Sequence, residues 1–341
     1  MAARPTAAHA AQAAQFADAS PREISPGADI EVDPTLMLQP RPDFVGGPAV
    51  EALADRAFSY LHGGYPVHFR GPAGSGKTTL ALHLAARIGR PVMLLVGDAT
   101  FDTRSLVGGE GAMRTKRVVD RYITSVMKVE SETAPVWMDR ALTIAVTDGC
   151  TLVYDEFNRA PAAANNVLLT VLEERVLVLP RAGRGECYLR VHPQFRIIFT
   201  SNPSDHVGAH LAQDALLDRM ITIDVDCFDR DTEVSIVAAR SGLPVGDAAR
   251  VVDMVRDFRR SGEFTQRPSL RAGLMISRLA AQHGMRVASD DPRFLATCLD
   301  VLGSRLKPGP YGLPEPTHRQ MLTRLVEHFC PATGAAQGGA R

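Results

Sequence analysis

The chain has 341 residues, of which 45% are apolar and 6% aromatic, and its 38 basic residues balance 38 acidic ones. A neutral chain without a basic and aromatic patch gives no electrostatic reason to expect a nucleic-acid partner. No stretch approaches the roughly 18 apolar residues of a membrane span, and the N-terminus lacks the continuous apolar core of a signal peptide. We therefore expect a cytoplasmic globular protein with no membrane partner.

Helical and strand patterns alternate over residues 36–230, which predicts an α/β core built on a parallel sheet. Apolar residues spaced three and four apart predict helices at 48–64, 77–89, 139–149 and 162–174. Short β-branched runs predict strands at 66–69, 90–97, 150–156, 195–203 and 220–225, and the runs 90–97 and 195–203 have the composition of buried strands. Two further runs, 175–180 and 187–191, flank a glycine-containing turn and predict a β-hairpin.

The β pattern disappears near residue 230, and only helical periodicity follows it up to about residue 330. This change predicts a small all-helical lid domain (231–330) after the α/β core (36–230). The Ala- and Pro-rich residues 1–35 and residues 331–341 contain few large apolar side chains. We therefore expect a disordered N-terminal tail and a flexible C-terminal tail.

A glycine-rich loop lies between the strand predicted at 66–69 and the helix predicted at 77–89. Its sequence GPAGSGKT (71–78) matches the pattern GxxxxGK[ST] of phosphate-binding loops. Glycines let backbone N–H groups converge on phosphate oxygens, and the start of the helix adds positive potential. We expect Lys77 to reach the β- and γ-phosphates and the Thr78 hydroxyl to hold Mg²⁺. The predicted nucleotide-binding residues are Gly71, Pro72, Ala73, Gly74, Ser75, Gly76, Lys77, Thr78 and Thr79.

Two adjacent acidic residues end a predicted strand, in the sequence TLVYDEFNR (151–159). Ligands of open α/β sheets bind at the carboxyl edge of the sheet. Two carboxylates without a compensating charge are energetically costly there, unless they bind a metal ion or transfer a proton. We expect Asp155 to bind Mg²⁺, directly or through water, and Glu156 to act as the base that activates the attacking water. A surface acidic pair without function is the alternative interpretation.

Three further polar residues occupy positions that suit contact with a nucleotide. Asn202 lies at the end of the predicted strand 195–203, so its amide is expected to bind the attacking water or the γ-phosphate; by itself, Asn-Pro indicates a turn. Arg219 lies between a helix and a strand, where it suits an arginine finger that enters a neighbouring subunit. Arg271 lies in the first turn of a helix, against the dipole preference, which favours contact with the γ-phosphate.

Three observations near these residues bear on the predictions. Ser269 is the expected N-cap of the helix that carries Arg271. A surface ion pair with Asp218 or Asp224 is the alternative role for Arg219. The basic run RTKRVVDR (114–121) is a solvated face by default, although it also suits a central channel or a partner surface.

The phosphate loop, acidic pair, strand-end Asn, arginine and helical domain, in this order, resemble the AAA+ ATPases. The sequences LLDRM (216–220), SLRA (269–272) and DEFNRAPAAANNVLLTVLEE (155–174) resemble the MoxR branch. Longer segments, at 97–128, 137–159 and 164–180, resemble the GvpN family of gas vesicle proteins, and the similarity covers about residues 40 to 330.

The resemblance implies a three-layer P-loop NTPase core of the AAA+ type with a helical lid. It also implies a Mg²⁺-dependent ATP hydrolase, with ATP and Mg²⁺ as cofactors, that works as a homo-oligomeric ring, a hexamer, with sites between subunits. Its partners would be other gas vesicle proteins, of the shell or accessory to it. Their remodelling would assist the assembly or enlargement of gas vesicles, so the protein is expected at gas vesicles.

The functional residues of the family map onto positions already singled out. The nucleotide loop corresponds to residues 71–78, and the metal and water positions to Asp155 and Glu156. The resemblance gives Asn202 the role of first sensor, and it gives the finger and second-sensor roles to Arg219 and Arg271. Arg159 and Arg230 lie near the same strand edges and are alternatives for the last two roles.

Two other functions use the same residues. A sister branch of these ATPases activates metalloenzymes such as Rubisco or nitric oxide reductase, and only the segments between the motifs favour the gas vesicle function over it. A nucleotide-gated scaffold, which binds ATP and scarcely hydrolyses it, is the second alternative. The intact pair of Asp155 and Glu156 argues against the scaffold.

Overall fold

The computed structural model of the chain describes residues 44, 46–119, 129–181, 185–203, 214–262, 264–265, 267–307 and 316–332. The predicted N-terminal tail lies outside these residues, and so does the predicted C-terminal tail from residue 333 onward.

A parallel sheet lies at the centre of the α/β part, as predicted. Its strands are β1 (Val67–Arg70), β2 (Val92–Val96), β5 (Thr151–Asp155), β8 (Arg196–Ser201) and β9 (Ile221–Asp224), in the order β2-β5-β8-β1-β9. Every neighbouring pair is parallel, so the carboxyl ends of all these strands share one edge. At that edge the glycine loop follows β1, and Asn202 follows β8. Of the acidic pair, Asp155 ends β5 and Glu156 comes directly after it.

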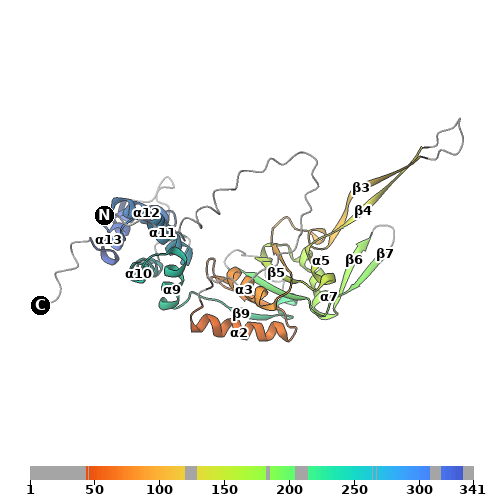
Figure 1. Ribbon diagram of the computed structural model, residues 1–341, viewed down its shortest axis with the longest axis horizontal. Coiled ribbons are helices and arrows are strands. Elements are labelled where there is room, and N and C mark those ends of the chain that lie inside the picture. Colours follow the sequence, from red (N-terminus) through yellow and green to blue (C-terminus); the bar gives the residue numbers. More distant parts are fainter. Residues whose placement is uncertain are drawn as a thin grey trace, which may run out of the picture. The chain divides into compact units, whose positions relative to one another are not determined.

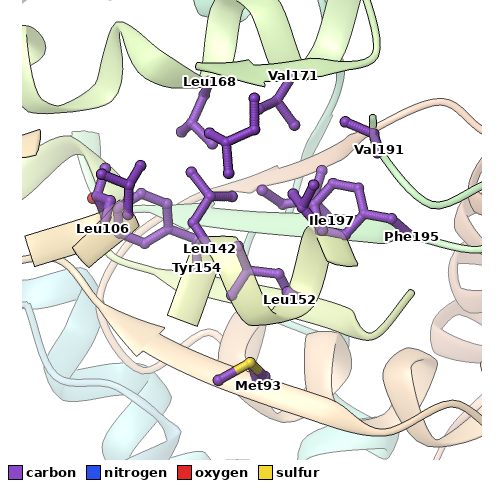
Figure 2. Packing of buried hydrophobic residues seen from close by; sticks show 14 of the residues in the cluster. Met93, Leu106, Leu142, Leu152, Tyr154, Leu168, Val171, Val191, Phe195 and Ile197 are labelled. Carbon is purple, nitrogen blue, oxygen red and sulfur yellow. The ribbon is translucent and has the colours of Figure 1, made fainter. Parts of the chain in front are cut away.

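Helices cover both faces of the sheet and make three layers. Strand residues alternate between the faces, so Val153 and Ile198 pack with α2 (Pro48–His62) and α3 (Lys77–Ile88). Their neighbours Leu152, Tyr154, Ile197 and Phe199 pack on the other face, with α4, α5 and α7. Figure 2 shows Leu152, Tyr154 and Ile197 beside Leu142, Leu168 and Val171 of these helices. The helices of this layer are α4 (Thr103–Val107), α5 (Ala141–Asp148), α6 (Ala162–Asn165) and α7 (Val167–Glu173).

Leu152 offers a test of how much this core contributes to stability. Its side chain is fully buried, so Leu152→Ala should lower the free energy of unfolding by about 2–5 kcal/mol, through lost burial and the cavity left behind. Urea unfolding measures the change. Leu94→Ala is the matched control, because Leu94 is 42% exposed and should lose about 1 kcal/mol or less. Equal losses in the two variants would contradict this assignment of the core.

The strand β2 differs from its prediction as a buried strand. Leu94 and Val96 are 42% and 49% exposed, because β2 is the outermost strand on its side of the sheet and pairs only with β5. The apolar composition of the run does not reveal which strand will lie at an edge. The predicted helix 162–174 also differs, since it is divided into α6 and α7. The buried side chain of Asn165, at the end of α6, accepts from the Tyr154 hydroxyl and donates to the carbonyl of Phe157.

Two antiparallel hairpins extend the α/β part. The predicted hairpin forms, from β6 (Val176–Arg181) and β7 (Gly185–Arg190). A longer one, from β3 (Gly108–Val119) and β4 (Val129–Asp139), was not predicted, because GGEGAMRTKRVV is poor in the β-branched and aromatic residues that indicate strands. Figure 1 shows it as a thin two-stranded ribbon. The basic run lies on β3 up to residue 119, and residues 120 and 121 lie outside the described residues.

The part of the chain after β9 is helical, as predicted. After the short helix α8 (Asp214–Leu217) and β9, the helices are α9 (Arg230–Ser241), α10 (Val245–Ser261), α11 (Leu270–Gln282), α12 (Pro292–Gly303) and α13 (Pro316–Phe329). They bury an apolar cluster of their own that includes Phe258, Ile276, Phe294 and Leu322. The segment Thr35–Arg341 forms one compact unit, so a domain boundary at residue 230 stays a prediction. No helix within the described ranges has the length and apolar character needed to cross a membrane.

Candidate nucleotide-binding site

The glycine loop connects the end of β1 to the start of α3 in the conformation that its sequence permits. Gly76 is the N-cap of α3 at a φ of 89°, and Gly74 has a φ of 77°, in the left-handed region that favours glycine. A Cβ atom added to Gly74 would lie 2.4 Å from the Ser269 hydroxyl. The loop therefore has room only for glycine where the helical part of the chain approaches it.

The side chains inside this loop are buried and polar. The Lys77 ammonium is in a residue only 7% exposed, and it donates to the carbonyl oxygens of Gly71 and Pro72, at 2.8 Å in both cases. The Ser75 hydroxyl is buried and has no hydrogen-bond partner among the described residues. A buried hydroxyl without a partner is costly, so the loop holds a donor suited to a phosphate oxygen.

Side-chain oxygen atoms from one helix, α3, and two strands, β5 and β8, lie close together beside the loop. The Thr78 hydroxyl, at the start of α3, donates to Asp155 Oδ1 at 2.8 Å. The Thr200 hydroxyl of β8 donates to the same oxygen and accepts from the Glu156 amide at 3.0 Å. Thr200 was not predicted; its position on β8, two residues before Asn202, is the only signal in the sequence. A hydroxyl and a carboxylate at this distance suit Mg²⁺, a hard cation that prefers oxygen ligands.

The two acidic residues have different environments. Asp155 ends β5 and bonds to the two threonines, whereas Glu156 has left the strand conformation, with a φ of 50°. The Glu156 carboxylate accepts from Arg159 Nη1 at 2.6 Å, and its side chain is 36% exposed. No group of three or more His, Cys, Asp or Glu side chains suited to a metal occurs among the described residues. A cation beside Asp155 would therefore need phosphate or water oxygens to complete its ligands.

Asn202 and Arg271 reach the same place from different parts of the chain. Asn202 follows β8 and is 6% exposed. Its backbone carbonyl oxygen accepts a hydrogen bond from Asn158 Nδ2 at 3.0 Å. Arg271 lies in the first turn of α11, as predicted. Ser269 occupies the predicted N-cap position in extended conformation, but its side chain makes no capping hydrogen bond. Its hydroxyl lies against Gly74 instead.

One cavity unites most of the predicted residues. The polar and loop residues that line it are Ala73, Gly74, Gly76, Lys77, Thr78, Thr79, Asp155, Glu156, Thr200, Asn202 and Arg271. It is also lined by Arg240 and by the apolar residues Phe44, Val50, Leu80, Phe228, Ile236, Leu270 and Leu274. Pro72 and Ser75 line an adjoining cavity that shares Gly74 and Arg271. Gly71 lines neither, but a Cβ atom there would lie 2.0 Å from the carbonyl oxygen of Val225.

Arg219 is the one predicted catalytic residue that does not line this cavity. It precedes Ile221, which pairs with Val67, so Arg219 lies at the amino edge of the sheet, whereas the loop follows the carboxyl edge. Its guanidinium donates to Glu173 Oε2 through Nε, at 2.7 Å, and through Nη2. The surface ion pair considered for Arg219 thus exists with a partner other than Asp218 or Asp224.

The two alternative arginines also have carboxylate partners. Arg159, at the carboxyl edge, bonds to Glu156, as described above. Arg230, at the start of α9, donates to both Asp253 carboxylate oxygens at 2.6 Å, and this hydrogen-bonded carboxylate raises the pKa of Arg230. Both arginines are therefore already bound within the chain.

His68 is a second residue of this region that sequence reasoning missed. It lies in the middle of β1 and is buried, with Nε2 2.8 Å from the Ser201 hydroxyl and Nδ1 3.0 Å from the Thr222 hydroxyl. Burial, with a smaller effect of Arg70, lowers the pKa of His68 to about 4. The ring is therefore neutral near pH 7, and it connects β1 to β8 and β9 just before the glycine loop and Asn202. A histidine within an apolar strand was the available signal.

Comparison with known proteins agrees with this fold. Residues 66–220 match the family AAA domain (dynein-related subfamily). The chain is 29% identical over 192 residues to the protein NorQ of Paracoccus denitrificans, which covers 56% of the chain and 62% of NorQ.

Gas vesicle ATPases are more similar over a greater length. Gas vesicle ATPase GvpN of Ancylobacter aquaticus is 48% identical over 313 residues, which cover 90% of the chain and 88% of that protein. The protein of the same name from Haloferax mediterranei is 40% identical over 266 residues, which cover 77% and 75%. Identity of this level over nearly the whole length of both proteins shows common membership, and so the chain belongs to the GvpN family of gas vesicle ATPases, a MoxR-like group of AAA+ enzymes.

Proposed function

We propose that this ATPase binds ATP with Mg²⁺ in the cavity beside the glycine loop and hydrolyses it there. The main support for this proposal is that one cavity is lined by the loop, by Thr78 and Asp155, and by the polar side chains of Glu156 and Asn202. The Thr78 hydroxyl and the Asp155 carboxylate are also hydrogen-bonded to each other. In this proposal the loop amides and Lys77 bind the phosphates. Phosphate oxygens then replace the carbonyl oxygens of Gly71 and Pro72 as acceptors of the Lys77 ammonium. Thr78 and Asp155 would hold Mg²⁺, which when bound would supply positive charge beside the phosphates.

The proposed reaction is the attack of water on the γ-phosphorus, in line with the bond to the leaving ADP. Glu156 accepts the proton that the water loses, Asn202 orients the water or the γ-phosphate, and Arg271 stabilises the charge from the lid side. For this role the Glu156 carboxylate has to exchange its bond to Arg159 for one to water. Closing and opening of the helical part then transmits the change from ATP to ADP to a partner.

A ring of subunits completes the proposed site. Arg219 cannot reach the cavity of its own chain from the opposite edge of the sheet, which supports a role as a finger in a neighbouring subunit's site. We propose a homo-oligomeric hexamer, in which each cavity lies between two subunits. The Glu173 carboxylate would release Arg219 when the subunits assemble.

The biological role that we propose is remodelling of gas vesicle proteins, of the shell or accessory to it, during vesicle assembly or enlargement. Its support is the name and the length of the matched relatives, gas vesicle ATPases over three quarters or more of their chains. NorQ matches less of the chain at lower identity. Deleting the gene in a vesicle-forming host should abolish flotation; normal vesicles in the deletion strain would contradict this role.

Lys77→Ala tests nucleotide binding. The variant should lose most of its affinity for ATP, because it removes the only lysine among the described residues that line the cavity. Calorimetry in the presence of magnesium measures the affinity. Lys307→Ala, at an exposed lysine in the helical part, is the control and should bind ATP as the wild type does. Unchanged affinity in Lys77→Ala would contradict the proposed site.

A nucleotide-gated scaffold with little hydrolysis is a second candidate, which the bond between Glu156 and Arg159 favours. If that bond persists in the assembled protein, the carboxylate is occupied and turnover is slow. Phosphate release from the wild-type protein distinguishes the two functions. We expect steady turnover, whereas tight ATP binding without phosphate release would support the scaffold.

A further inference from the structure

We propose that Arg240 recognises the nucleotide base and that, because it offers only hydrogen-bond donors, the site accepts guanine nucleotides as well as adenine nucleotides. This inference rests on the proposed function, since it assigns the base-binding end of the same cavity. It names the substrate class of the site as purine nucleoside triphosphates in general.

The apolar part of the cavity lining has the composition of a base-binding pocket. Val50 of α2 and Ile236 of α9 are buried there, and Leu274 of α11 and Phe44 complete the apolar wall. The Phe44 ring is fixed by stacking on His83 of α3, with ring centroids 3.7 Å apart and planes at 9°. Apolar and aromatic walls of this kind fit a planar heterocycle.

Arg240 is the one charged residue that α9 contributes to the described lining of this cavity. It lies in the last turn of α9, and its backbone carbonyl accepts from Arg278 Nε of α11 at 3.2 Å. Its own Nε is buried and has no hydrogen-bond partner within the described part of the chain. A buried donor without a partner is costly, so an acceptor atom on a ligand in the cavity would stabilise this arrangement.

The donor pattern of arginine decides which bases suit it. A guanidinium has five N–H donors and no acceptor, and it pairs well with the O6 and N7 acceptors of guanine. Adenine presents N7 as an acceptor but an amino group at position 6, which needs an acceptor from the protein. The apolar side chains that line the cavity with Arg240, those of Phe44, Val50, Ile236 and Leu274, offer no acceptor for that amino group. A glutamine would supply both a donor and an acceptor, the pattern that suits adenine.

The test is to measure the dissociation constants of ADP and GDP by calorimetry for the wild type and for Arg240→Gln. The wild type should bind the two within about 10-fold of each other. Arg240→Gln should shift the preference toward ADP by roughly 5- to 100-fold, the range expected for a bidentate contact with a base. Arg319→Gln, at an exposed arginine on α13, is the matched control and should leave the ratio unchanged. Hydrolysis of ATP and GTP should follow the same order.

Three outcomes have defined meanings. Rejection of GDP by the wild type by more than about 100-fold, or an unchanged ratio in a folded Arg240→Gln, would overturn the inference. If Arg240→Gln does not fold, as judged by circular dichroism, Arg240→Lys replaces it; lysine also only donates, so a changed ratio there would overturn the inference. Failure to bind either nucleotide would instead contradict the proposed function, whereas tight ADP binding alone leaves that function in place.

Discussion

Glu156→Gln should bind ATP as tightly as the wild type and hydrolyse it about 10²- to 10⁴-fold more slowly, the range by which a positioned base accelerates a reaction. The amide has nearly the shape of the carboxylate but cannot accept the proton of the attacking water. Binding should persist because the proposed phosphate contacts come from the loop, Lys77 and Thr78, and the proposed role of Glu156 is to accept a proton from water. Phosphate release measures turnover, and calorimetry measures affinity.

A nearby glutamate provides the control for this variant. Glu174 follows α7, is exposed, and does not line the cavity in the described part of the chain. Glu174→Gln should therefore keep wild-type turnover. If Glu156→Gln also hydrolyses ATP at the wild-type rate, Glu156 is not the base, and the bond to Arg159 would be its main role.

Arg219→Ala should lower ATP hydrolysis by about 10³-fold or more, the size of the effect of an arginine finger. The expected loss is large although Arg219 is far from the cavity of its own chain, because its guanidinium would neutralise charge on the γ-phosphate in the next subunit. Arg87→Ala is a matched control. Arg87 is similarly exposed, at 31% against 30% of the side chain, and it also pairs with one carboxylate, that of Asp55.

Mixing two inactive variants separates a contribution between subunits from one within a subunit. In a mixed ring of Arg219→Ala and Glu156→Gln, some cavities combine an intact Glu156 with an intact Arg219 from the neighbour. The mixture should recover part of the wild-type turnover. An absence of recovery at every mixing ratio would place the role of Arg219 within its own chain, against the position at the amino edge of the sheet.

Local sequence patterns were sufficient for the elements that form the core of the site. The glycine loop, its flanking strand and helix, and the strands that end at Asp155 and Asn202 were predicted close to their observed bounds. The reason is that backbone conformation and burial leave direct traces in the sequence. Glycine at positive φ, an apolar strand run and helical spacing each depend on residues that are near one another in the chain.

The contacts among these elements could not be predicted in the same way. Thr200 bonds to Asp155 because β8 lies beside β5, and His68 connects β1 with β8 and β9 because β1 lies between them. The partner of Arg219 is Glu173, a residue 46 positions away that neither alternative included. Strand order and helix placement set these contacts, and residues distant in the sequence carry no pattern that pairs them.

Patterns of neighbouring residues were enough to predict a glycine-rich phosphate loop, an acidic pair at the end of a strand, and a helical segment after an α/β core. The packed fold was needed to show that β2 is an exposed edge, that β3 and β4 form a long hairpin, and that Arg240 lines one cavity with apolar side chains from three other segments of the chain. A conformational preference acts within a few residues, whereas burial and side-chain pairing depend on the packing of the whole fold.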